Sequence, residues 1–175
     1  IDSEYPEDYP PYKGLLTFTD KDQDFFFGRD GIIQQLLDGL NNWRFVPVLG
    51  ASGSGKSSLV LAGLLPALDK ADWVVLEMRP TANPLVSLRD TLVRHYGDEV
   101  TEVAVLNASV DFRREAERIT ANGHRLLLVV DQFEELFTQA DTAQCRQFDY
   151  LLATALTDPE CPFFLISTIR SDFLD

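Results

Sequence analysis

Basic residues are scarce in this chain of 175 residues. It contains 15 lysines and arginines against 28 aspartates and glutamates, and its formal net charge is −13 at pH 7. Proteins that hold nucleic acid or an anionic membrane on a broad surface need a basic face. We therefore expect no nucleic-acid contact and no membrane contact from this domain.

Cysteine and histidine are also rare. Cys145 and Cys161 lie far apart, as do His95 and His124, and none of the four has the spacing of a metal-ligand set. Unpaired thiols are typical of a reducing compartment, so the sequence favours a cytoplasmic protein. Long apolar runs are lacking too, and no stretch approaches the roughly 20 residues that a membrane-spanning helix needs.

The most informative segment that the chain does contain is 50–57, which reads GASGSGKS. It fits the phosphate-binding pattern G-x-x-x-x-G-K-[ST]. The apolar stretch 45–49 before it predicts a strand, and the residues from Ser57 onward predict a helix. Strand, glycine-rich loop and helix in this order predict a P-loop.

Each residue type in this loop has a physical use. Glycines allow the backbone to turn its N–H groups toward phosphate oxygens. The helix N-terminus adds partial positive charge, Lys56 can reach the β- and γ-phosphates, and the hydroxyl of Ser57 can ligate Mg²⁺. The residues expected to bind ATP or ADP here are Gly50, Ser52, Gly53, Ser54, Gly55, Lys56, Ser57 and Ser58.

A second motif follows an apolar run at 125–130, which ends in Asp131. Such a run is typical of a strand that is buried on both faces of a parallel sheet. It delivers its terminal carboxylate to the edge where ligands bind in open α/β sheets. Asp131 is therefore predicted to be the Walker B aspartate that holds Mg²⁺ together with Ser57. A simple helix N-cap is the alternative role for such an aspartate.

Two acids, Glu134 and Glu135, come three and four residues after Asp131. One of them can orient or deprotonate the water that attacks the γ-phosphate. Either can instead be a first-turn acid that stabilises a helix N-terminus. We favour Glu134 for the catalytic role and keep Glu135 as the alternative.

The rest of the chain alternates strands with helices, which predicts an α/β fold with three layers, in which a mostly parallel sheet is flanked by helices on both faces. The last strand ends in Arg170, which can contact the γ-phosphate at the ligand edge. Pro47 lies inside the first strand, where a central position would lose a ladder hydrogen bond. Strands are expected at 45–49, 73–78, 125–130 and 162–169, and helices at 30–40, 84–95, 111–122 and 142–157.

These motifs together resemble the novel STAND NTPases of bacteria, in particular their first group, which are related to the NACHT and AAA-type ATPases. The resemblance runs almost from end to end. Its marks are PYKGL at 11–15, FFGRD at 26–30, the P-loop, MRP at 78–80, the segment 126–137 and RSDF at 170–173.

The resemblance assigns further roles. Gly28 and Arg29 match the hhGR motif near the nucleoside end of the site. DQFEE at 131–135 is similar to the extended Walker B motif of the NACHT ATPases, and Arg170 matches the sensor-one arginine. The implied function is an ATP-dependent switch in signal transduction or bacterial defence, with slow hydrolysis. Partners implied for the full-length protein are further copies of itself on activation and attached sensor or effector domains.

Two segments bear on domain organisation. Residues 1–19 are rich in proline, tyrosine and acids, which predicts an extended arm or linker, and 20–175 are expected to form the P-loop NTPase domain. The resemblance also implies that this domain is truncated after the sensor-one strand, so weak hydrolysis is expected from this segment. Two other functions stay open: a nucleotide-binding scaffold or adaptor without significant hydrolysis, and another P-loop enzyme such as a kinase.

Overall fold

The structure is a computed structural model that describes residues 28–96, 110–120 and 123–173. The predicted arm at 1–19 lies outside the described residues, and a single domain over 20–175 stays a prediction. Within the described residues four strands form one parallel sheet in the order β1-β4-β3-β2. They are β1 (Phe45–Gly50), β2 (Trp73–Met78), β3 (Arg125–Val130) and β4 (Phe163–Arg170).

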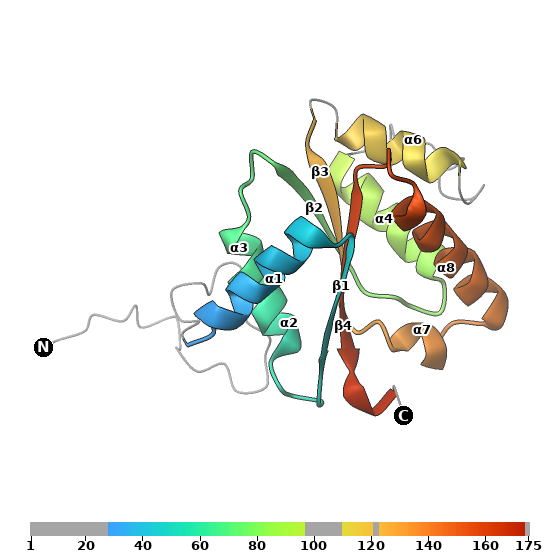
Figure 1. The fold of residues 1–175 in the computed structure, drawn as a ribbon. Helices are drawn as coiled ribbons and strands as arrows, with labels where there is room; N and C mark the ends of the chain where they lie inside the picture. The colour runs from blue at the N-terminus through green and yellow to red at the C-terminus, as the bar shows by residue number, and fades with distance from the viewer. Residues whose placement is uncertain (1–27, 97–109, 121–122, 174–175) are drawn as a thin grey trace, which may run out of the picture.

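Helices cover both faces of this sheet (Figure 1). On one face lie α1 and the continuous helical segment α2–η2–α3, and on the other lie α4, α6 and α8. The predicted three-layer α/β fold is thereby confirmed. The helices are α1 (Asp30–Asn42), α2 (Lys56–Ser58), the π-helix η2 (Leu59–Leu64), α3 (Leu65–Ala67), α4 (Pro84–Tyr96), α6 (Val110–Ile119), α7 (Glu135–Thr138), α8 (Thr142–Thr157) and the 3-10 helix η3 (Ser171–Phe173).

The apolar run of β3 forms the middle of the core. Leu126, Leu128 and Val130 are buried in the hydrophobic cluster beneath α4, α6 and α8. Leu127 and Val129 are buried in the opposite cluster, beneath α1 and η2. Because successive side chains of a strand point to opposite faces, only a continuous apolar run can fill both clusters. The strand therefore has a fixed register, which determines where the residue after it lies.

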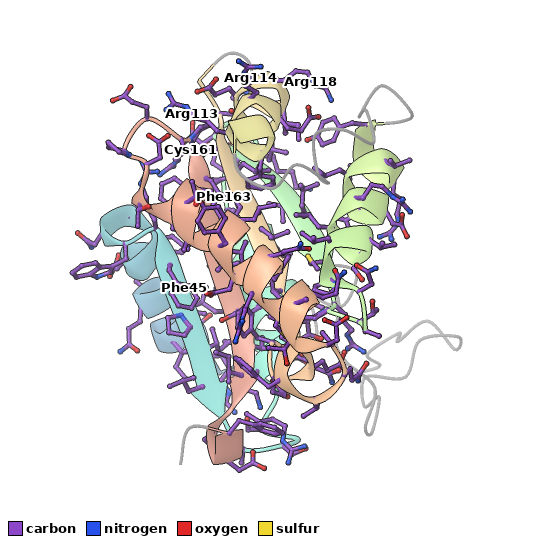
Figure 2. The ribbon with its side chains drawn as sticks, turned by 90° about the vertical axis from the view of Figure 1, so that its right-hand side faces the viewer. Phe45, Arg113, Arg114, Arg118, Cys161 and Phe163 are labelled. Atoms are coloured by element: carbon purple, nitrogen blue, oxygen red, sulfur yellow. The ribbon has the colours of Figure 1, made fainter. Side chains whose placement is uncertain are left out.

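The start of β4 is anchored at the end of the sheet that lies opposite Asp131, the residue after β3. Phe163 is fully buried, and its ring meets the ring of Phe112 edge-on at a centroid distance of 5.1 Å. Figure 2 shows Phe163 and Cys161 at this end, with Arg113 of α6 close by. Burial raises the pKa of the Cys161 thiol, so this side chain stays protonated and packs as a small apolar group.

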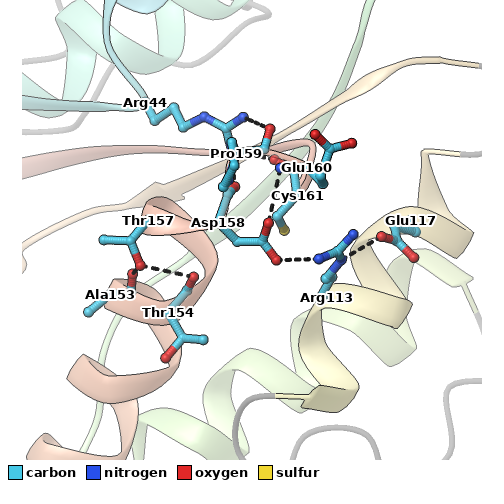
Figure 3. Close-up of polar contacts among 10 residues, drawn as sticks. All are labelled: Arg44, Arg113, Glu117, Ala153, Thr154, Thr157, Asp158, Pro159, Glu160 and Cys161. Carbon is cyan, nitrogen blue, oxygen red and sulfur yellow. Dashed lines mark hydrogen bonds and ion pairs between the residues drawn. The ribbon is translucent and has the colours of Figure 1, made fainter.

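Arg44, just before β1, holds the turn that leads into β4 (Figure 3). Its guanidinium donates hydrogen bonds to the carbonyl oxygens of Asp158 at 2.9 Å, Pro159 at 2.6 Å and Cys161. Arg113 of α6 binds the Asp158 carboxylate at 2.5 Å. Two arginines from distant parts of the chain thus fix one turn, and with it the position of β4.

The first strand, β1, lies at the edge of the sheet within the described residues, where it pairs with β4 and with no other strand. Phe45 and Leu49 are exposed along it. A proline is tolerated in an edge strand because no ladder hydrogen bond is required on the outer side. This position accounts for Pro47, whose conflict with a central strand was apparent from the sequence.

The predicted elements agree with those of the structure to within a few residues at each end. The helix α6 is described as far as Ile119, and the predicted end at residue 122 lies outside the described residues. At its end the Thr120 hydroxyl donates to Ala116 O at 2.7 Å. Among the described helices, none is both long and apolar enough to cross a membrane.

Candidate functional site

The parallel topology brings the ends of all four strands to one edge of the sheet. Gly50 at the end of β1 is paired with Arg170 at the end of β4. Met78 at the end of β2 is paired with Val130 at the end of β3. The segments that follow β1, β2 and β3 therefore start beside one another, at the edge where ligands bind in such sheets.

The P-loop begins at the end of β1 and leads into α2. Gly53 and Gly55 have φ angles of 71° and 85°, which lie in the left-handed region that glycine adopts without strain. A Cβ atom on Gly50 would lie 2.8 Å from Ser54 Oγ, so a larger residue there would require the Ser54 side chain to move. The loop residues Ala51 to Gly55 are exposed. The predicted cradle for phosphate therefore has its backbone on the surface, where a ligand can reach it.

Lys56 lies over this loop. Its Nζ donates hydrogen bonds to Gly50 O and Ala51 O, each at 2.8 Å. The ammonium group is thus held at the mouth of the loop by the loop's own carbonyl groups. A phosphate bound by the loop would lie close to this charge, as the sequence predicts.

The hydroxyl of Ser57 donates to Asp131 Oδ1 at 2.5 Å. Asp131 follows β3 directly and is 6% exposed, so its carboxylate needs hydrogen-bond partners. Thr168 of β4 supplies a second hydroxyl to the same oxygen at 2.7 Å. The two residues that the sequence predicts as ligands of Mg²⁺ are therefore in direct contact.

Thr168 is a residue of this site that sequence reasoning missed. Its hydroxyl also accepts a hydrogen bond from Gln132 N at 2.9 Å, and its carbonyl accepts one from Phe133 N at 2.9 Å. These bonds hold the backbone after Asp131, where Gln132 has a φ of 58°, an uncommon angle for a residue other than glycine. The available signal was a pair of adjacent hydroxyl residues, Ser167 and Thr168, near the end of a mostly apolar strand.

Glu134 and Glu135 have different surroundings. Glu134 is buried, 7% exposed, and its Oε2 accepts a hydrogen bond from the backbone N of Arg170 at 3.3 Å. Glu135 is half-buried and opens the short helix α7. Glu135 thus has the position of a first-turn helix acid, whereas Glu134 is directed at the end of β4. This contrast favours Glu134 for the predicted role beside the γ-phosphate.

The side chain of Arg170 is turned toward Asp172 in η3. Its Nε and Nη2 donate to the two carboxylate oxygens at 3.1 and 2.5 Å. This hydrogen-bonded pair lowers the pKa of Asp172 and raises the pKa of Arg170. The positive charge of Lys56 also lowers the pKa of Asp172, which places Asp172 within electrostatic reach of the P-loop. Arg170 is therefore near the site but is held by another residue.

Arg79 is a second residue that sequence reasoning gave no role. It follows β2 directly, and both its Nε and its Nη2 donate to Asp131 Oδ2, at 3.0 and 2.8 Å. The MRP segment was noted as a mark of resemblance alone. The pairing depends on strand order, because β2 and β3 must be neighbours for Arg79 to reach Asp131.

The remaining predicted nucleotide-binding residues lie in the P-loop and in α2, or at the start of α1. Ser52 and Ser54 are exposed in the loop, and Ser58 is half-buried in α2. Gly28, with a φ of 78°, and Arg29 lie at the exposed start of α1. The Arg29 carbonyl accepts from the first backbone N–H groups of that helix. A role of Gly28 and Arg29 at the nucleoside end of the site stays a prediction.

The donor set fits a magnesium ion bound with a nucleotide. Mg²⁺ prefers oxygen ligands and binds proteins through one or two side chains together with substrate phosphates and water. The hydroxyl of Ser57 and the carboxylate of Asp131 are such ligands. Among the described residues no group of three histidine, cysteine or acidic side chains could hold a metal ion. The site is therefore suited to a metal that arrives with phosphate oxygens rather than to a metal held by protein side chains alone.

Comparison with known proteins agrees with this geometry. A family model described as Novel STAND NTPase 1 matches residues 11–175 of the chain. No curated protein has a significantly similar sequence.

Two solved structures with the same fold illustrate the likeness. The ORC2 protein of Aeropyrum pernix, solved as ADPNP-ADP complexes, has a TM-score of 0.53 and 16% identity, over 83% of this chain and 41% of that one. The Walker-type ATPase paby2304 of Pyrococcus abyssi has a TM-score of 0.56 and 15% identity, over 90% of this chain and 48% of that one. The chain spans less than half of each. At these identities the likeness shows the fold alone.

Proposed function

Because the chain belongs to the Novel STAND NTPase 1 family, we propose that it is the ATP-binding and ATP-hydrolysing switch domain of a larger bacterial signalling or defence protein. The reaction is hydrolysis of the γ-phosphate bond, with Mg²⁺ as the cofactor. The intact protein is proposed to self-associate when activated and to act through attached sensor or effector domains. Slow turnover suits such a switch, because the bound nucleotide must last long enough to report a state.

One observation carries this proposal: the contact between Ser57 Oγ and Asp131 Oδ1. A P-loop alone binds phosphate, and a buried strand that ends in aspartate is common. The contact joins the two motifs at the C-terminal edge of the sheet, next to the exposed glycine loop. It supports a site in which phosphate oxygens, one hydroxyl and one carboxylate share a cation. When bound there, Mg²⁺ would neutralise charge on the phosphate oxygens.

The proposed roles of the other residues follow from their places. Lys56 and the backbone of the glycine loop bind the phosphates. Glu134 orients the attacking water and accepts its proton. Arg170 would contact the γ-phosphate after leaving Asp172, and in this way the occupancy of that position could alter the end of β4.

The experiment that tests hydrolysis compares two neighbouring carboxylates in the intact protein. Glu134→Gln is expected to slow ATP turnover at least about 100-fold while the affinity for ATP stays within a few-fold, because a general base typically contributes that much to the rate. Glu135→Gln is the matched control and should retain most of the turnover. A larger loss from Glu135→Gln would give the role to Glu135. Nucleotide binding without any turnover in the wild-type protein would instead indicate a scaffold.

A further inference from the structure

The carboxylate of Asp131 has a cation on one oxygen and hydroxyl donors on the other. Oδ1 accepts from Ser57 and Thr168, and Oδ2 accepts twice from Arg79. The Asp131 side chain is 9% exposed, whereas the Arg79 side chain is 54% exposed. A buried carboxylate without a cation is costly, so Arg79 has a clear stabilising effect here.

We propose that Arg79 is a built-in counter-ion of Asp131 that competes with Mg²⁺ for this carboxylate. The inference rests on the proposed function, because it concerns the metal that accompanies the nucleotide. A metal ion at Asp131 would bring two positive charges close to the guanidinium, and the two cations would repel each other. Arg79 must therefore leave Oδ2, or weaken its hold there, when Mg²⁺ is bound.

The surroundings of Arg79 allow this movement. A pocket of about 440 Å³ lies between the ends of β2 and β3 and helix α4, and Arg79 and Asp131 both line it. Glu77 and Asp90 line the same pocket, together with Arg94 and apolar side chains of η2, β2 and β3. The guanidinium would therefore find two other carboxylates in a pocket of mixed polarity. The half-exposed guanidinium can thus move aside without a change in the backbone of β2.

The competition has a functional consequence. While Arg79 holds Asp131, the metal-binding carboxylate is kept in place and neutralised. Binding of the metal with its nucleotide releases a cationic side chain directly after β2. The side chain directly after β2 would therefore change its partners when the metal binds, as the proposed function has Arg170 do at the end of β4. Arg79 acts here as a positioning residue, since its effect passes through Asp131.

The first test measures how much Mg²⁺ the intact protein needs to bind ADP, by titrating Mg²⁺ at a fixed concentration of fluorescent ADP. Arg79→Gln removes the charge and keeps a polar side chain, although a shorter one. It is expected to lower the half-saturating Mg²⁺ concentration about 3- to 10-fold, while affinity for ADP in excess chelator stays within about 2-fold. Arg79→Lys keeps the charge, so its half-saturating Mg²⁺ concentration should remain closer to that of the wild type. Arg114→Gln, at an exposed position of α6, is the matched control for the loss of one positive charge and should change nothing.

The second test needs no nucleotide. Arg79→Gln should lower the melting temperature of the ligand-free protein by a few degrees, and the same change in an Asp131→Asn background should have little further effect. Equal losses in both backgrounds would overturn the pairing. An unchanged or higher Mg²⁺ requirement in Arg79→Gln would overturn the competition. A wild-type protein that binds no ADP at any Mg²⁺ concentration would instead overturn the proposed function, and the competition with it, while the melting experiment still judges the pair.

Discussion

Ser57 and Asp131 are 74 residues apart in the sequence, yet their side-chain oxygens lie 2.5 Å apart. This contact requires the loop after β1 and the end of β3 to meet, although β4 lies between these two strands in the sheet. Thr168 of β4 bridges the gap, because its hydroxyl binds the same Asp131 oxygen. The three side chains form one hydroxyl–carboxylate cluster.

Removal of the Ser57 hydroxyl should weaken nucleotide binding only when Mg²⁺ is present. Ser57→Ala is expected to reduce the affinity for MgADP about 10-fold, the usual effect of losing a hydrogen bond or ligand bond to a charged group. Binding in excess chelator should be nearly unchanged. Ser57→Thr keeps the hydroxyl and serves as the matched control. Equal losses with and without Mg²⁺ would show that Ser57 acts on the loop and not on a metal.

The P-loop glycine Gly55 gives a prediction about stability. Gly55 has a φ of 85°, so Gly55→Ala should cost about 1–2 kcal/mol of unfolding free energy or distort the loop. Gly31, in α1, has open space around it and no positive φ. Gly31→Ala should be neutral or stabilising by up to about 1 kcal/mol. Urea unfolding of the two variants checks this contrast. Similar values for both would mean that the loop does not have the described conformation.

The turn before β4 should depend on Arg44. Three carbonyl groups accept hydrogen bonds from this guanidinium, so Arg44→Ala is expected to cost about 1.5–3 kcal/mol of unfolding free energy. Arg114→Ala, at an exposed position of α6, is the control and should stay within about 0.5 kcal/mol of the wild type. Urea unfolding again gives the values. A loss no larger than that of the control would show that the turn is held without Arg44.

The parts of the fold that repeat a local pattern could be predicted from the sequence. The strand at 73–78 and the helix at 142–157 have the bounds that their periodicity indicates, because apolar side chains and flanking residues determine them locally. The P-loop is likewise a local motif. Pro47 marked a conflict with a central position of this strand, but the strand order was not apparent, since it depends on how distant segments pair.

The candidate site shows the same division. Lys56, Ser57, Asp131 and Glu134 could be predicted because each lies in a motif or directly beside one. Thr168 and Arg79 could not be assigned, because each reaches Asp131 from a neighbouring strand and the sequence does not contain the strand order. The pairing of Arg170 with Asp172 was also missed, since a strand-end arginine has several acids within reach.

Calorimetric titration of MgATP and MgADP into the intact wild-type protein and its Lys56→Ala variant tests the central claim, that this edge of the sheet binds nucleotide phosphates. Lys70→Ala, at an exposed position before β2, is the matched loss of one positive charge. The account predicts that Lys70→Ala binds each nucleotide with the same affinity as the wild type. Lys56→Ala should bind them about 1.5–3 kcal/mol more weakly, which is roughly 10- to 150-fold in affinity. Unchanged affinity in Lys56→Ala, or no binding by the wild type, would contradict the account.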